Sequence, residues 1–334
     1  MAKYQLSEQD EYAHEPSADS NFNESVYVNG IDHNTGSGFW MRLGNRVNEG
    51  HAELQLCFYL PDGRLACQFL RPDIEDNRAF AAGGMNYTVS EPHRSVAMEY
   101  RGEVMLLDDL ALLREPRRLF TEADKTEISI ASELTNISPV YGGAPVDDDQ
   151  ATMYGRDFSL GHFFQHMRTS ATIQLGGDSF DIDGLGWRDH SWGPRYWTNI
   201  HFYRLFIVNF DNGDGFTLLK ITDRNGGTRR IGVMVINGEF EEIIDADLIT
   251  EWDEFRDPSR IRLGLRTANR VAMMQGEVQT LAPLSNRRKL DDGSELRTRI
   301  AEGFTKWSWG DLSGYGLSEY IERVEEGVPV GYPM

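Results

Sequence analysis

The sequence lacks the motifs that identify most cofactor-dependent enzymes. It has no G-x-x-x-x-G-K-[ST] loop and no G-x-G-x-x-G motif after a strand, the two patterns that bind nucleotides and dinucleotides through backbone amides. It also has no H-E-x-x-H, C-x-x-C or G-x-S-x-G motif, so zinc-hydrolase, redox and serine-hydrolase functions lose their main support. We therefore expect no cofactor, and any chemistry has to come from acid–base side chains in a shaped pocket.

Positive charge and long apolar runs are also scarce. The chain has 33 basic against 53 acidic residues, a net charge of −20, and such a negative field repels nucleic-acid phosphates and anionic membranes. No apolar stretch approaches the ~20 residues of a membrane-spanning helix, and residues 1–20 contain no apolar secretory segment. We expect a cytoplasmic protein without nucleic-acid or membrane partners, and the sequence leaves open whether two copies form a homodimer.

Cysteine is rare as well, since the 334 residues include only Cys57 and Cys67. These flank the sequence FYLPDGRLA, in which the PDG tripeptide is typical of a three-residue hairpin loop. Such a hairpin would place the two thiols opposite each other, where a cross-strand disulfide is geometrically feasible. In a cytoplasmic protein we expect two reduced, half-buried thiols instead.

Short apolar stretches rich in β-branched and aromatic residues alternate with Gly, Asn and Asp clusters, a pattern typical of β structure. In residues 202–244, three turn signals separate four strand-like segments and predict an antiparallel meander. A second hairpin is predicted at 51–70, and short helices at 72–80 and 107–116. Further strands are predicted around residues 95–107, 126–135, 171–175, 261–268, 271–282 and 296–304. Strands without intervening helices indicate an all-β protein of barrels or sandwiches.

The length of the chain is sufficient for two domains. We expect residues 1–20 to form a mobile N-terminal arm, residues 21–180 one β domain and residues 181–334 a second β domain. The Gly-, Pro- and Asp-rich stretch 139–155 is typical of a long loop, and such a loop is usually functional or a connection between domains.

The densest group of polar and aromatic residues is GLGWRDHSWGPRYW, residues 184–197. Successive side chains of a strand point to opposite faces, so Asp189 and His190 are not expected to pair, and at most one of them faces a bound molecule. Trp187 would share a face with Asp189, and apolar surroundings suit a carboxyl group that acts as a general acid. Arg188 would share a face with His190, and a cation beside an imidazole favours its neutral form. The alternative is a purely structural cluster of ion pairs and cation–π contacts.

The segment GHFFQH has the spacing of a metal-ligand pair, because His162 and His166 are four residues apart and would share a face of a helix or strand. Asp157 or Asp189 could supply a third ligand. Two histidines without a defined third ligand are weak evidence, so we predict that they form hydrogen bonds in a polar pocket, or that one is simply exposed, and that no metal binds. The weaker alternative is a metal-dependent enzyme that uses His162 and His166.

The segment GWRDHSWGPRYW closely resembles the signature of the carotenoid 1,2-hydratase-like (hydroxyneurosporene synthase-like) proteins, including their uncharacterised bacterial relatives. Weaker similarities lie in FNESVYVNGIDHNTGSGFWMRLGNRVNEGHAEL, residues 22–54, and in GYGLSEYIE, residues 314–322. The resemblance spans roughly residues 20–322. It implies two lipocalin-like antiparallel β domains, each a barrel or curved sheet, packed together with a cavity between them.

The resemblance also implies catalysis without a cofactor on apolar substrates. We predict a lyase that performs hydration, cyclisation or elimination on an isoprenoid, polycyclic or phenylpropanoid-like aromatic compound; the alternative is a non-catalytic carrier of a hydrophobic ligand. An aspartate and a histidine would move the proton, and an arginine would stabilise negative charge. The predicted catalytic residues are Asp189, His190, Asp157, His162, Arg188 and Arg195. The predicted substrate-binding residues are Trp187, Trp192, Trp197, Tyr154, Phe164, Gln165 and His166.

Overall fold

The chain folds into two compact β units. The computed structural model describes residues 3–147, 152, 154–156, 158–196, 200–289 and 293–333. Unit 1 comprises Met1–Leu106 and Asp124–Trp197, and unit 2 comprises Leu107–Ala123 and Thr198–Met334. Each unit is built around one large antiparallel sheet, which confirms the predicted all-β fold.

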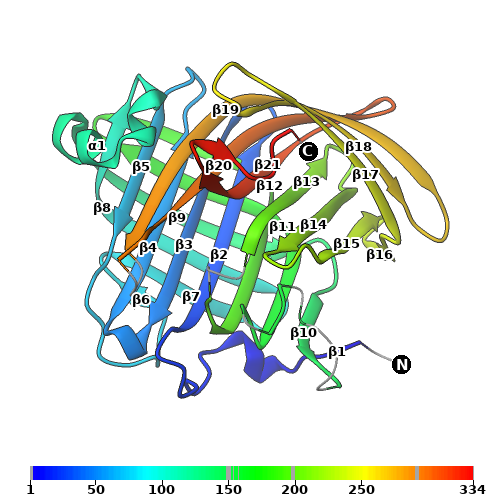
Figure 1. Ribbon diagram of the computed structural model, residues 1–334, viewed down its shortest axis with the longest axis horizontal. Helices are drawn as coiled ribbons and strands as arrows, with labels where there is room; N and C mark the ends of the chain where they lie inside the picture. Colours follow the sequence, from blue (N-terminus) through cyan, green and yellow to red (C-terminus); the bar gives the residue numbers. More distant parts are fainter. Residues whose placement is uncertain are drawn as a thin grey trace. The chain divides into compact units, whose positions relative to one another are not determined.

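In unit 1, the described residues form a 12-stranded sheet in the order β1-β10-β11-β12-β2-β3-β4-β5-β8-β7-β6. The ninth strand, β9, pairs with both β11 and β8, so the path between these two strands closes on itself. Figure 1 shows β2, β3 and β4 side by side in this sheet. The strands are β1 (Tyr4–Gln5), β2 (Phe22–Asp32), β3 (Ser37–Arg46), β4 (His51–Tyr59), β5 (Leu65–Leu70), β6 (Ala81–Ala82), β7 (Met85–Glu91), β8 (Ser95–Leu107), β9 (Asp124–Asn136), β10 (Tyr141–Pro145), β11 (Gly161–Leu175) and β12 (Asp178–Pro194). Two 3-10 helices, η1 (Glu8–Glu11) and η2 (Val47–Glu49), precede β2 and β4.

The hydrophobic core of unit 1 is built from every second residue of its strands, because alternate side chains point to the same face. In β2 and β3, Val26 lies opposite Leu43 and Val28 lies opposite Met41. All four side chains are fully buried in one continuous apolar cluster. Burial of each such side chain stabilises the fold by roughly 1.5–3 kcal/mol.

In unit 2, the described residues form a 10-stranded sheet in the order β16-β15-β14-β13-β21-β20-β19-β18-β17, with β22 pairing with β21. The amide of Ile243 donates to Gly232 of β15 and that of Ile244 donates to Arg266 of β18, so the short link between β16 and β17 bonds to both strands. The strands are β13 (Ile200–Phe210), β14 (Gly215–Asp223), β15 (Thr228–Ile236), β16 (Glu239–Glu242), β17 (Asp245–Trp252), β18 (Pro258–Arg266), β19 (Val271–Lys289), β20 (Glu295–Trp309), β21 (Leu312–Glu325) and β22 (Val328–Pro329). The short helices η3 (Leu110–Arg114) and α1 (Pro116–Glu122) also belong to this unit.

Local turn chemistry predicted several of these elements correctly. Strands β13 to β16 pair in chain order and confirm the meander at 202–244, while β4 and β5 confirm the hairpin at 51–70. Within that hairpin Cys57 lies directly opposite Cys67. No disulfide joins them, and both side chains are fully buried rather than half-buried. Burial raises the pKa of Cys67 to about 12.

Two local predictions differ from the structure. Helices η3 and α1 fit the helix predicted at 107–116, but no helix forms at 72–80. In that segment the side chain of Asn77 donates to a buried carboxylate of Glu24 and to the backbone carbonyl of His14, contacts that an irregular backbone accommodates. The loop predicted at 139–155 contains strand β10, which pairs with β11.

The N-terminal segment, residues 3–21, is attached to unit 1, which differs from the predicted mobile arm at 1–20. Strand β1 pairs with β10, and Glu11 at the end of η1 is completely buried in an ion pair with Arg188. The predicted boundary at residue 180 also differs, because it falls inside β12, which pairs with β11 from Asp178 to Trp192.

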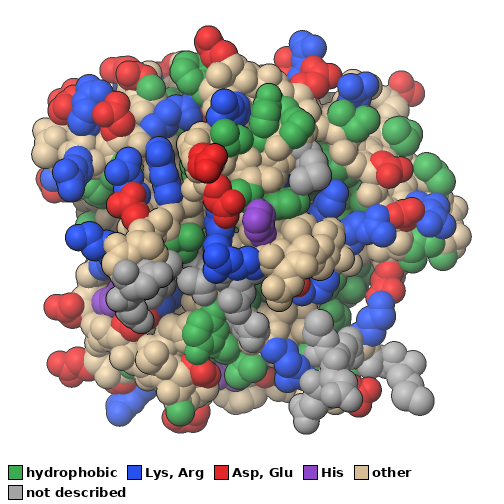
Figure 2. Space-filling model, in the orientation of Figure 1, with side chains coloured by type: hydrophobic (Ala, Val, Ile, Leu, Met, Phe, Trp, Pro, Cys, Tyr) green, Lys and Arg blue, Asp and Glu red, His purple; other side chains and the backbone are tan. Residues whose placement is uncertain are grey.

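Side chains of both charge signs are interspersed over the face of the molecule shown in Figure 2, with scattered apolar groups between them. Mixed charge of this kind is typical of surfaces in contact with water. None of the helices in the described parts of the chain has the length and apolar character needed to cross a membrane.

Candidate active site

The site is organised by two neighbouring strands, β11 and β12, whose register fixes which side chains share a face. Asp189 lies opposite Phe164 and His190 lies opposite Phe163. Because side chains alternate, β12 presents Trp187, Asp189 and Ser191 on one face, here called the dyad face. It presents Arg188, His190 and Trp192 on the other, here called the core face, since their β2 neighbours Val26 and Val28 belong to the hydrophobic core.

A histidine–aspartate dyad lies at the centre of the dyad face. His162 Nε2 and Asp189 Oδ2 are 2.9 Å apart, and the side chain of His162 is 1% exposed while that of Asp189 is 15% exposed. With the carboxylate accepting the proton on Nε2, the lone pair of the ring lies on Nδ1. This Nδ1 atom is buried, and among the described residues it has no hydrogen-bond partner. In this tautomer the dyad keeps one ring nitrogen, Nδ1, available as a base.

Aromatic rings surround this dyad. Tyr154 contacts the His162 ring edge to face at 4.9 Å, and Phe164 stacks on Trp187 at 5.4 Å. The ring of Tyr27, on β2, extends the group by contacting Trp187 at 5.8 Å. Ionisable groups set in such apolar surroundings are typical of ligand and active sites.

Arg195 adds a cation beside the dyad face. Its Nη2 donates to the hydroxyl of Ser191 at 2.9 Å, and its guanidinium lies 4.4 Å from the ring of Phe158. Burial, and then repulsion from Arg42, lowers the pKa of Arg195 to about 10. The group is still cationic at neutral pH, so it is able to stabilise negative charge that develops nearby.

The core face holds a buried ion pair instead. Both terminal nitrogens of Arg188 donate to the carboxylate of Glu11 at 2.6 Å, and neither side chain is exposed. Gln165 accepts two further hydrogen bonds from this guanidinium, and the ring of Phe163 lies 5.3 Å from it. Burial alone would raise the pKa of Glu11, but the hydrogen bonds and charge of Arg188 outweigh burial and lower it.

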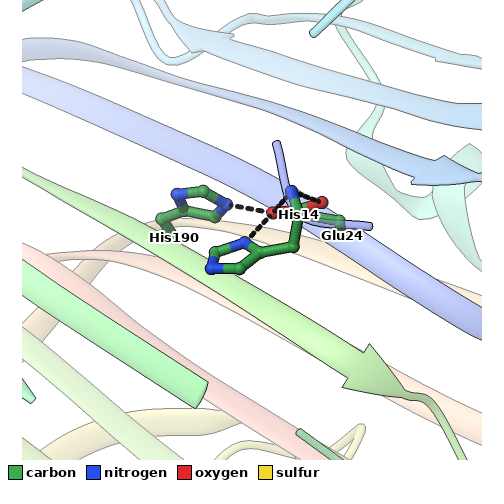
Figure 3. Close-up of side chains that lie close together, drawn as sticks. All are labelled: His14, Glu24 and His190. Carbon is green, nitrogen blue, oxygen red and sulfur yellow. Dashed lines mark hydrogen bonds and ion pairs between the residues drawn. The ribbon is translucent and has the colours of Figure 1, made fainter. Parts of the chain in front are cut away.

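A second buried carboxylate on this face, Glu24 of β2, collects two imidazoles. His14 Nδ1 and His190 Nε2 lie 2.6 and 2.9 Å from its Oε1 atom, and both rings point at this carboxylate in Figure 3. Asn77 donates to the other oxygen. Burial would raise the pKa of Glu24, yet the hydrogen bonds of both histidines lower it to about 2.

The register also explains one glycine. Gly161 lies directly opposite Trp192, and a Cβ atom added at Gly161 would come within 2.1 Å of the indole ring. Only glycine therefore lets Trp192 lie flat across β11, where its ring stacks on His14 at 4.0 Å.

The structure thus divides the predicted site residues between two faces of one sheet. Asp189 and His162 come together with Trp187, Phe164, Tyr154 and Arg195, whereas Arg188, His190, Trp192 and Gln165 line the core face. His166 is fully buried on β11 opposite Trp187, but it is not part of the metal-ligand group found among the described residues. Asp157 and Trp197 lie outside the described residues.

Sequence reasoning missed Glu11, His14, Glu24 and Tyr27. Two of them, Glu24 and Tyr27, lie within the motif at 22–54, which gave a signal for their region but not for their contacts. Glu11 and His14 lie in the segment expected to be mobile, and an isolated glutamate or histidine there gives no local sign of burial.

Unit 2 contains a pair of neighbouring glutamates, of which Glu302 is buried and Glu319 is partly buried. Glu302 of β20 lies directly opposite Glu319 of β21, and the hydroxyl of Tyr203 donates to Glu319 at 2.7 Å. Burial, followed by the charge of Glu319, raises the pKa of Glu302 well above its usual value. Protonated Glu302 can donate its proton to Glu319, whereas two ionised carboxylates on these paired positions would repel each other.

This pair predicts a characteristic pH dependence of stability. Because the folded pKa of Glu302 is raised, its contribution is most favourable below the unfolded value near 4.5 and is lost as pH rises through the folded pKa. Glu302→Gln should flatten that decline, and near pH 8 its free energy of unfolding should be higher than that of the wild type. Urea unfolding at several pH values measures this pH dependence of the free energy of unfolding. The control is Glu295→Gln, at a half-exposed position on the same strand, which should leave the pH dependence unchanged. An unchanged pH slope in Glu302→Gln would contradict the assignment.

Comparison with known proteins places the chain in a family. The family model described as "Domain of unknown function (DUF7064)" matches residues 7–324. The chain belongs to this family. No curated protein matches the sequence.

Solved structures share the fold of this DUF7064 protein. An AttH-like protein from Nitrosomonas europaea is 13% identical with a TM-score of 0.58, and the alignment covers 96% of both chains. CghA is 10% identical with a TM-score of 0.58, over 91% of this chain and 88% of CghA. Kievitone hydratase from Nectria haematococca is 9% identical with a TM-score of 0.55, over 96% of both chains. At these identities the likeness shows the fold alone.

Proposed function

We propose that the protein is a cofactor-independent lyase that adds or removes a small group, such as water, on a hydrophobic substrate. The observation that carries this proposal is the dyad of His162 and Asp189, a buried base and its carboxylate set among aromatic rings. The substrate would be an isoprenoid, a polycyclic compound or a phenylpropanoid-like aromatic, since planar apolar groups match the rings of Tyr154, Phe164 and Trp187.

Elimination or addition of water at this site needs one base, His162, and one cation, Arg195. Asp189 keeps the ring proton on Nε2, so Nδ1 of His162 accepts a proton from a substrate carbon. The carbon–oxygen bond on the adjacent carbon then breaks, and the proton on Nδ1 passes to the departing hydroxyl, which leaves as water. Hydration is the reverse sequence. Arg195 would stabilise negative charge that develops on the substrate during either direction.

Two further findings support a lyase. One solved structure of the same fold is named as a hydratase, and the segment GWRDHSWGPRYW resembles the carotenoid 1,2-hydratase-like proteins. The ionisable dyad favours an enzyme over a carrier of hydrophobic ligands, because a carrier binds its ligand through apolar contacts and needs no acid–base group.

The test is isotope incorporation. The protein is incubated in heavy-isotope water (²H and ¹⁸O) with a panel of apolar alkenes, hydroxylated isoprenoids and phenolic compounds, and each compound is analysed by mass spectrometry. We expect at least one compound to gain deuterium and ¹⁸O in an enzyme-dependent reaction that His162→Gln abolishes. A panel member that binds tightly without any exchange would instead identify a carrier.

A further inference from the structure

The core face of β12 carries a cluster that the proposed lyase reaction does not use. Among the described residues, His14, Glu24 and His190 form the one group of three or more histidine, cysteine or acidic side chains whose ligand atoms all lie within 4.8 Å of one another. Figure 3 shows that both imidazoles converge on the same carboxylate. The three residues come from the N-terminal segment, β2 and β12, so the fold, and not local sequence, creates the group.

The donor atoms suit a borderline transition metal. Two imidazole nitrogens and one carboxylate oxygen are ligands that zinc takes in sites with three protein ligands and an open fourth position. Bonds of 2.0–2.1 Å in a tetrahedral site put neighbouring ligand atoms about 3.3 Å apart. The His14 Nδ1 and His190 Nε2 atoms lie 2.6 and 2.9 Å from Glu24 Oε1, so these atoms need to separate by less than 1 Å to admit an ion.

The surroundings already hold these ligands in place. Nε2 of His14 lies 3.1 Å from Asp10 Oδ1, and a carboxylate on the outer nitrogen orients the ligand ring and keeps the lone pair of the inner nitrogen on the metal. The ring of Trp192 stacks on His14 at 4.0 Å. Glu24 and His190 are completely buried, while 23% of the His14 side chain is exposed, which leaves a side from which an ion and a water ligand can enter.

We propose that His14, Glu24 and His190 bind one zinc-type divalent ion, which fastens the N-terminal segment to the sheet of unit 1. The ion would lie on the opposite face of β12 from the dyad of His162 and Asp189, so it takes no part in proton transfer. This proposal is therefore independent of the proposed lyase activity.

The test is metal binding by the full-length protein. After treatment with a chelator and dialysis, wild-type protein titrated with Zn²⁺ should bind one ion per chain, and Co²⁺ in its place should give the visible absorption of a tetrahedral nitrogen–oxygen site. His14→Gln should abolish the Co²⁺ absorption and weaken Zn²⁺ binding at least 100-fold. Asp10→Asn should weaken it 10- to 100-fold, as loss of an outer-shell carboxylate does.

His201→Gln is the matched control, because His201 is a half-exposed histidine of unit 2, and it should bind Zn²⁺ like the wild type. Circular dichroism of each variant confirms that it is folded before titration. The proposal is overturned if the wild type binds no stoichiometric ion, or if His14→Gln binds Zn²⁺ as tightly as His201→Gln. Isotope exchange on the lyase substrate should be the same with and without the metal, which separates a failure of this proposal from a failure of the proposed function.

Discussion

Asp189→Asn is expected to lower kcat by about 10²- to 10⁴-fold, the usual contribution of a positioned acid–base group. The asparagine amide can donate a hydrogen bond to Nε2 of His162, which moves the ring proton to Nδ1 and removes the lone pair that the reaction needs. The side chain is nearly isosteric, so KM and the fold should change little. The measurement is the rate of isotope exchange on the substrate that the panel identifies.

Asp183→Asn is the control for this prediction. Asp183 lies on the same strand, but its side chain is 73% exposed in an ion pair with Arg168, so kcat should stay within twofold of the wild type. If Asp189→Asn keeps its activity, the dyad has no catalytic role. If the variant loses activity because it unfolds, a wild-type rate in His162→Gln would refute the dyad independently.

The second large effect concerns stability. Glu11→Gln leaves the guanidinium of Arg188 buried without its counter-charge, and breaking a buried ion pair in this way costs about 3–5 kcal/mol. We expect a loss of that size in the free energy of unfolding at pH 7, measured by urea titration. Glu8→Gln removes an exposed carboxylate of the same helical turn and should change stability by less than about 0.5 kcal/mol.

The ion pair of Glu11 with Arg188 also determines how the stability of the fold changes in acid. Because the folded pKa of Glu11 is lowered, the pair contributes its full stability above the unfolded pKa near 4.5 and loses it as pH falls through the folded value. The difference between wild type and Glu11→Gln should therefore shrink as pH drops below about 4.5. A difference that stays constant down to pH 3 would show that the ion pair contributes nothing to folding.

The alternation of side chains along a strand was enough to predict that Asp189 and His190 point to opposite faces of the sheet. The sequence WRDHSW reads as extended, so Asp189 and His190 had to diverge, and the structure places them on opposite faces with different partners. The side-chain period of two is a property of any strand, so this inference needed no tertiary information.

The partners themselves could not be predicted in this way. Glu11 and Arg188 are separated by 177 positions, and Glu24 and His190 by 166. The first contact depends on where the N-terminal segment packs, and the second on the pairing of β12 with β2. Local patterns in one sequence do not show which distant segments pack or pair with each other. The helix predicted at 72–80 failed for a related reason, since the contacts of Asn77 with Glu24 and His14 are long-range and outweigh weak local helix propensity.

The pairing of β12 with β2 also constrains the order of events during synthesis. Strand β2 is complete by residue 32 but can pair with β12 only when Asp178–Pro194 has been made, roughly 7 to 32 s later at common elongation rates of 5–20 residues per second. Throughout that interval one edge of β2 has no partner, and the carboxylate of Glu24 has no His190. An unpaired strand edge of this kind is prone to edge-to-edge association, from which chaperones protect nascent chains.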